Sequence, residues 1–152
     1  MRRFVSSFLF VLLPLILCIL LGKDTEAQNQ KLSYVRLYSD EIGITHFSDE
    51  IILWSTNYVS VMLTDDFKAE SVGFVRAMPG WFMSWHPAPR RQLLIVLTGS
   101  MEIEAGDGEK RIFEPGSVLL VEDTEGKGHK TKAVSQKELF FVWVPVSNSQ
   151  LK

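Results

Sequence analysis

Residues 80–99 of the chain read GWFMSWHPAPRRQLLIVLTG, and this stretch decides the fold. Its second half, residues 92–98, is a short run of branched and aliphatic residues bounded by turn residues, which predicts a buried strand rather than a helix. Pro87 keeps His86 in extended backbone, because a proline ring disfavours helical backbone at the residue before it. We therefore expect two strands, with His86 at the end of the first and a break at Pro87 and Pro89.

Short strands separated by turn residues continue on both sides of this stretch. Residues 101–105 alternate apolar and acidic side chains, as a half-buried strand does, and Gly106-Asp107-Gly108 is a hairpin signal. Residues 65–71 could form one helical turn, but no stretch after residue 31 shows sustained helical periodicity. This pattern predicts an all-β sandwich or barrel. We expect strands at 34–38, 42–47, 51–55, 58–63, 72–78, 92–98, 101–105, 111–113, 118–121, 129–134 and 139–146.

The composition predicts a single globular domain, which we place at residues 31–147. Of the 152 residues, 46% are hydrophobic and 22% are charged, and the formal net charge is −2. Such a chain can bury its own core, and without a long basic run interleaved with aromatics it is not expected to bind nucleic acid. The sequence contains no phosphate-binding loop and no nucleophile elbow. The only cysteine, Cys18, lies before the predicted domain, so we expect no disulfide in it.

The first 27 residues have a different character. Two arginines at positions 2 and 3 precede an apolar stretch at residues 8–21, and Thr25-Glu26-Ala27 places small residues where a signal peptidase would cleave. We interpret residues 1–27 as a signal peptide, which implies a secreted or periplasmic protein. The alternative is an uncleaved membrane anchor, because the run at residues 4–22 approaches the length that spans a bilayer.

The spacing in the 80–99 stretch resembles the first motif of the cupin superfamily. That motif is a glycine, five residues, His-x-His, three or four residues, a glutamate, six residues and a glycine. Gly80, His86, Gln92 and Gly99 fall on these positions. Two positions depart from the motif, because Ala88 stands at the second histidine and Gln92 at the glutamate.

The second cupin motif is similar to residues 114–129, EPGSVLLVEDTEGKGH. Pro115, Gly116 and His129 match it, although the segment between them is longer than usual. The resemblance covers roughly residues 34–145 and implies a conical jelly-roll barrel. It says less about the reaction, because one fold hosts many functions.

The resemblance also implies where a pocket would lie. In the cupin pattern, His86 and His129 occupy metal-ligand positions on facing strands that point into the barrel. We expect them to line a shared pocket, with Gln92 on the same wall. Successive strand residues point to opposite faces, so at most one of Arg90 and Arg91 is expected near the pocket mouth. An inward guanidinium there could clamp a carboxylate or phosphate.

A divalent transition metal is the cofactor that the resemblance leaves open. Two histidines seldom hold a first-row metal without a third ligand. His46, in the segment GITHF, or Gln92 could supply that ligand. Glu122 and Asp123 could also do so, but we expect both to lie in a solvated loop.

The sequence therefore predicts an exported or membrane-anchored single-domain cupin that binds a small molecule in its barrel. The alternative is a divalent-metal-dependent cupin enzyme of the oxygenase or isomerase type. A structural partner protein is a third class, and it would expose a large apolar patch instead of a polar pocket. The expected partner is a small-molecule ligand, and membrane association through residues 4–22 and a homodimer are left open.

Overall fold

The computed structural model describes residues 31–58 and 61–147, and these residues form strands and loops without a helix. The predicted signal or anchor segment, residues 1–27, lies outside them. Across the part of the chain that is described, no helix has the length and apolar character needed to cross a membrane. The chain divides into two units, residues 1–32 and 33–152. All strands lie in the second unit, apart from the first residue of β1.

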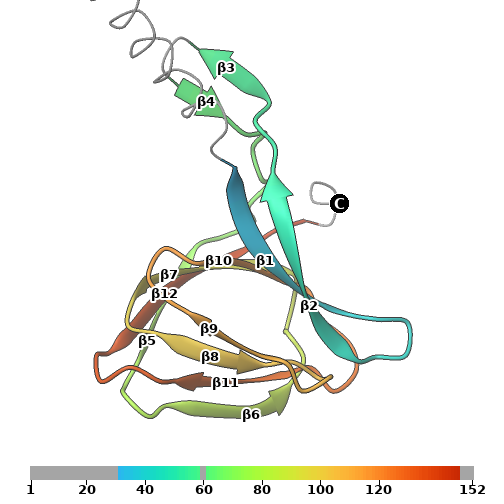
Figure 1. The fold of residues 1–152 in the computed structure, drawn as a ribbon, viewed down its shortest axis with the longest axis vertical. Coiled ribbons are helices and arrows are strands. Elements are labelled where there is room, and N and C mark those ends of the chain that lie inside the picture. The colour runs from blue at the N-terminus through green and yellow to red at the C-terminus, as the bar shows by residue number, and fades with distance from the viewer. Residues whose placement is uncertain (1–30, 59–60, 148–152) are drawn as a thin grey trace, which may run out of the picture. The chain divides into compact units, whose positions relative to one another are not determined.

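The larger sheet has six strands in the order β2-β1-β10-β7-β12-β5 (Figure 1). β1 pairs with β10 in parallel, whereas β10 with β7, β7 with β12 and β12 with β5 pair antiparallel. Its strands are β1 (Leu32–Ser39), β2 (Thr45–Ile52), β5 (Gly73–Ala77), β7 (Gln92–Thr98), β10 (Val118–Val121) and β12 (Leu139–Pro145).

The smaller sheet has four strands in the order β6-β11-β8-β9, all paired antiparallel. In Figure 1 it lies opposite the larger sheet, with β8, β9 and β11 facing β7, β10 and β12. A separate hairpin consists of β3 (Thr56–Tyr58) and β4 (Val61–Leu63). The four strands of the smaller sheet are β6 (Phe82–His86), β8 (Met101–Glu104), β9 (Lys110–Phe113) and β11 (His129–Ala133).

The main core lies between these two sheets, as the alternation of the sequence predicts. On β8, Met101 and Ile103 are fully buried, while the intervening Glu102 and Glu104 form ion pairs with lysines of β11 at 2.9 and 2.7 Å. The same cluster includes Leu94 of β7, so both sheets contribute to it. An all-β jelly-roll of two packed sheets follows, as predicted.

Three local expectations were wrong. The single strand expected at 58–63 is instead part of the antiparallel pair of β3 and β4. The strands expected at 42–47 and 51–55 are one strand, β2, because the Asp40 side chain accepts hydrogen bonds from the backbone N–H groups of Ile42 and Ile44 and holds a turn before it. The helical turn expected at 65–71 does not form. Ala69 instead makes an isolated β-bridge with Val146, so this segment runs extended beside the end of β12.

Candidate functional site

A cavity of about 430 Å³ lies between the sheets and is lined by strands of both. Most of its wall is apolar, and the polar side chains on it are His86, Gln92, His129 and Thr131. The apolar lining consists of Val75, Trp81, Met83, Pro87, Ala88, Pro89, Leu94, Met101, Val121, Phe141 and Trp143. The three residues that the sequence placed in a shared pocket, His86, Gln92 and His129, therefore do lie around one cavity.

The two cavity histidines face each other across the β6–β11 pair. His129 is the register partner of His86, and their ring centroids are 4.4 Å apart. Gly128 makes this approach possible, because a Cβ at this position would lie 2.0 Å from the carbonyl oxygen of His86. Its φ of +72° also favours glycine. A glycine before His129 is thus required for the two histidines to lie this close together.

A buried carboxylate orients His129. Its Nδ1 donates to Asp123 Oδ2 at 2.7 Å, and Asp123 is 0% exposed. The Thr45 hydroxyl lies 3.4 Å from the same oxygen, and the backbone N–H of Ala88 donates to the Asp123 carbonyl at 3.0 Å. The solvated loop expected for Asp123 was wrong, because contacts from distant parts of the chain bury it. Since a carboxylate oxygen only accepts here, the tautomer of His129 that fits this contact has its proton on Nδ1 and its lone pair on Nε2.

The role of Asp123 beside His129 was not predicted from the sequence, which suggested Asp123 only as a metal ligand. Glycines 126 and 128 both have positive φ, and they turn the chain so that Asp123 meets a histidine six residues later. The glycine-bearing loop in the sequence was the available signal for such a turn.

A backbone carbonyl holds His86 in the same tautomer, with the proton on Nδ1. Its Nδ1 donates to the Ser84 carbonyl at 2.7 Å, so the neutral ring also presents Nε2 as an acceptor. Burial lowers the pKa of His86 below its ordinary value of 6.5, against the opposing effects of the Ser84 carbonyl and the Asp123 charge, and a proton on His129 would lower it further. His86 is therefore a neutral imidazole at neutral pH.

Gln92 adds a third acceptor. The residue is 6% exposed, and its Oε1 has no hydrogen-bond partner among the residues that the structure describes. Leaving a buried acceptor unpaired costs free energy, so such an atom in a cavity wall calls for an occupant. The polar side of the cavity thus combines two imidazole rings, one amide and the Thr131 hydroxyl.

These atoms only partly fit a metal ion. Hydrogen bonds from Nδ1 to a carboxylate or a carbonyl are typical supports of metal-ligating histidines. However, Ala88 places a methyl group where the cupin motif has another imidazole, and a neutral amide is a weak third ligand. Within residues 31–58 and 61–147, no group of three His, Cys, Asp or Glu side chains could hold a metal ion.

His46 does not join the cavity residues, so its predicted place in the site was wrong. Its Nε2 lies 3.0 Å from Asp40 Oδ2 and its Nδ1 lies 2.7 Å from Asp107 Oδ2. The hydrogen bonds to Asp40 and then Asp107 raise its pKa above the ordinary value. Both ring nitrogens are therefore occupied by a clamp between the β1–β2 and β8–β9 loops.

The two arginines also lie outside the cavity lining, contrary to the expectation that one would reach its mouth. Arg91 donates from Nε to Glu122 Oε2 at 2.7 Å and from Nη1 to the Ser147 carbonyl at 3.0 Å. Arg90 is exposed. Glu122 also pairs with Arg36, so it is a structural ion-pair partner rather than a solvated loop residue.

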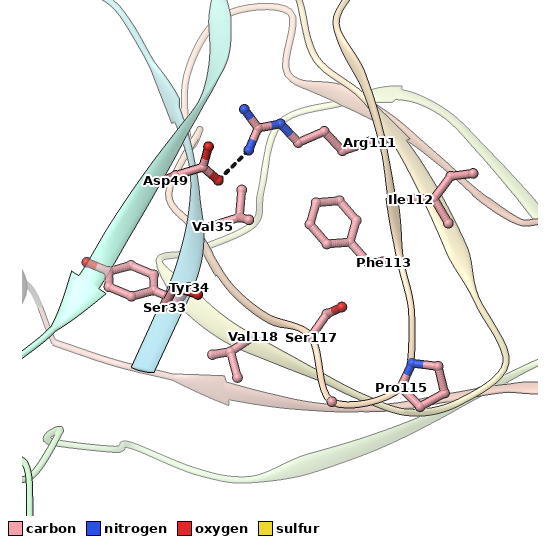
Figure 2. Close-up of a pocket in the computed structure, with 11 residues that line it drawn as sticks. Ser33, Tyr34, Val35, Asp49, Arg111, Ile112, Phe113, Pro115, Ser117 and Val118 are labelled. Carbon is pink, nitrogen blue, oxygen red and sulfur yellow. Dashed lines mark hydrogen bonds and ion pairs between the residues drawn. The ribbon is translucent and has the colours of Figure 1, made fainter. Parts of the chain in front are cut away.

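A second depression, of about 460 Å³, lies beside β1 and β9 (Figure 2). Arg111 and Asp49 span it with an ion pair of 2.7 Å, which Figure 2 draws as a dashed line. The same guanidinium also bonds Glu109 at 2.7 Å and lies 5.0 Å from the ring of Phe47. Because the charge of Arg111 is already matched within the protein, this depression is a weaker candidate than the histidine cavity.

Part of the chain is similar to a known protein family. The cupin domain family model matches residues 73–145, which contain both cavity histidines. No curated protein matches the chain. Among solved structures, a cupin domain from Bordetella pertussis Tohama I has 23% identity and a TM-score of 0.41, over 50% of this chain and 79% of its own.

Two further solved structures are similar to the same extent. A conserved double-stranded β-helix protein from Klebsiella pneumoniae has 23% identity and a TM-score of 0.42, over 53% of this chain and 69% of its own. The polyketide cyclase RemF from Streptomyces resistomycificus has 22% identity and a TM-score of 0.42, over 53% and 61%. The family match, with the two motifs inside it, identifies residues 73–145 as a cupin domain.

Proposed function

We propose that this cupin is a binding module that holds a small, largely apolar molecule in the cavity between its sheets. The observation that carries the proposal is the cavity itself, whose apolar wall is interrupted by the His86–His129 pair and the unpaired oxygen of Gln92. Ligand sites typically combine a mostly apolar concavity of roughly 300–1,000 Å³ with a few polar groups that fix orientation.

The test uses a neutral fluorescent arylamine, N-phenyl-1-naphthylamine, whose emission rises in apolar surroundings. Met83 lies on the cavity lining and is 42% exposed, so Met83→Trp should narrow the cavity without disturbing the core. Phe82→Trp is the matched control, because Phe82 is the next residue of the same strand and lines the outer face instead. We expect probe binding to weaken at least about tenfold in Met83→Trp and to be unchanged in Phe82→Trp. Equal effects, or no binding to the wild-type protein, would count against the cavity.

A metal-dependent enzyme is the second candidate, favoured by the way both histidines direct Nδ1 to fixed acceptors. His86 and His129 would hold the ion, with Gln92 as a weak third ligand, and a bound ion would supply Lewis-acid chemistry. Elemental analysis after loading with Zn²⁺ or Fe²⁺ tests this candidate. We expect His86→Ala and His129→Ala each to abolish metal retention. Less than about a tenth of an ion per wild-type chain would reject it.

Export is a separate part of the proposal and depends on residues 1–27. Their charged start, apolar centre and small-residue exit are typical of a signal peptide. Sequencing the N-terminus of the native protein should find a start near residue 28. A full-length chain that stays with membranes after a carbonate wash would support the anchor alternative.

A further inference from the structure

Three polar atoms on the cavity wall are hydrogen-bond acceptors, and they lie beside the Thr131 hydroxyl and the Gln92 amide NH2 group, which can also donate. Nδ1 of each histidine is committed to an acceptor, Ser84 carbonyl oxygen in one case and the Asp123 carboxylate in the other. Neutral imidazole has one donor and one acceptor nitrogen, so Nε2 of both rings is left as an acceptor. The unpaired Oε1 of Gln92 is the third.

No positive side chain balances these acceptors within the cavity lining that the structure describes. The lining contains no lysine or arginine, and the nearest candidates in the sequence, Arg90 and Arg91, lie outside it. The Lys130 and Lys132 ammonium groups lie on the opposite face of β11, paired with Glu104 and Glu102. An anionic ligand head would therefore meet lone pairs without a cation in the lining, and the carboxylate of Asp123 lies behind the His129 ring.

We propose that the cavity selects ligands whose polar end donates hydrogen bonds, namely hydroxylated or amino-substituted aromatic or alicyclic molecules without a carboxylate or phosphate. This inference rests on the proposed binding function and names its ligand class. The apolar body of the ligand would contact side chains such as Trp81, Phe141 and Trp143. Its hydroxyl or N–H group would donate to His86 Nε2, His129 Nε2 or Gln92 Oε1.

The experiment uses three matched probes that share one ring system. 2-Naphthol donates and accepts, 2-methoxynaphthalene only accepts, and 2-naphthoate is an anion. Binding to the full chain is measured by calorimetry at about pH 8, where the His86 ring, whose pKa is lowered, is neutral. We expect 2-naphthol to bind at least about tenfold more tightly than 2-methoxynaphthalene. 2-Naphthoate should bind at least about a hundredfold more weakly than 2-naphthol.

Two variants test whether the cavity acceptors cause the preference. Gln92→Leu replaces an unpaired buried acceptor by an apolar side chain of similar size, so the protein should keep its stability. In this variant the preference for 2-naphthol over the methyl ether should shrink at least about threefold, while binding of the ether is kept or improved. Lys132→Ala, on the outer face, is the control and should leave all three affinities unchanged.

The outcomes separate this inference from the proposed function. If 2-naphthol and its methyl ether bind equally, or if 2-naphthoate binds most tightly, the cavity binds ligands but the donor class is wrong. If the preference for 2-naphthol appears only after metal loading and disappears with a chelator, the acceptors serve a metal and the inference is overturned. If none of the probes binds to any form of the protein, both the inference and the binding function are overturned.

Discussion

His129, in the cavity, and His46, outside it, make the same contact in two different surroundings. His129 and His46 each place Nδ1 2.7 Å from an aspartate Oδ2, that of Asp123 and Asp107 respectively. The His129 side chain is 6% exposed and its aspartate 0%, whereas the His46 side chain is 31% exposed and its aspartate 29%. The contact is therefore the same, and the burial and the fate of the other ring nitrogen differ.

The second ring nitrogen distinguishes the cavity histidines, which could bind a ligand, from His46, which has a structural role. The second nitrogen of His46 meets another carboxylate, Asp40, so the charged ring has two partners and nothing left to offer a ligand. The second nitrogens of His86 and His129 have no protein partner among the described residues and line a cavity. A histidine is thus a candidate ligand-binding group when one ring nitrogen is hydrogen-bonded within the protein and the other has no protein partner.

The largest effect is expected from breaking the close approach that pairs His86 with His129. Gly128→Ala places a Cβ against the His86 carbonyl oxygen, a rigid backbone atom, in a conformation that L-residues disfavour. We expect the free energy of unfolding to fall by about 3–5 kcal/mol, measured by urea denaturation. The NMR signals of the His46 ring should stay in place.

Gly80→Ala is the matched control, because Gly80 also has a positive φ of +80° but no atom within 4 Å of its would-be Cβ. It carries the backbone strain alone and should cost about 1–2 kcal/mol. Equal losses in the two variants would mean that the His86 backbone yields readily and that the pair does not depend on this approach.

A medium effect is expected from removing the aspartate on each side of the comparison. Asp123→Ala leaves the His129 Nδ1–H buried without its acceptor and should cost about 3 kcal/mol. Asp107→Ala removes the same contact where water can replace it and should cost about 1 kcal/mol or less. Thermal and urea unfolding of both variants measure the difference. If the two costs match, burial does not distinguish the two histidine sites.

The smallest expected effect is that the contributions of His46 and His86 to stability depend on pH in opposite directions. The raised pKa of His46 contributes stability that is fully present below its ordinary value of 6.5 and is lost as the pH rises through the folded pKa. The lowered pKa of His86 contributes stability that is present above 6.5 and is lost as the pH falls towards the folded pKa.

Unfolding free energies between about pH 5 and pH 9 check this prediction, because unperturbed histidine titrates between them. The destabilisation by His46→Gln should be greater at the acidic end, and that by His86→Gln should be greater at the alkaline end. Each change should stay below about 1 kcal/mol, since His46 is partly solvated. Parallel slopes for the two variants would contradict the assignment of a clamp and a neutral site.

Much of the fold follows from local sequence rules. Alternation predicted β8, the apolar run 92–98 predicted β7, and the prolines after His86 predicted the break between β6 and β7. These features are determined by residues that are close in sequence, so a local sequence pattern is enough to predict them. The prediction of a helical turn at residues 65–71 was wrong because this segment pairs with the end of β12, which lies more than 70 residues away in the chain.

The site was predictable only in part, for the same reason. Motif spacing brought His86, Gln92 and His129 together, and the structure places them around one cavity. Ligand or metal binding by them stays a prediction. The burial of Asp123 depends on Thr45, 78 positions away, and the outward course of Arg91 depends on Glu122 and the Ser147 carbonyl. Alternation along one strand has no information about such distant partners.

The parallel pairing of β1 with β10 has a consequence for the time course of synthesis. Val35 pairs with Leu119, more than 80 residues later in the chain, so one edge of β1 must wait for its partner. At about 5–20 residues per second, the ribosome needs roughly 4–17 s to supply it. During that interval β1 can pair only with β2, and its other edge is open to unrelated strands. Slower translation of the segment before β10 should therefore raise aggregation of the nascent chain.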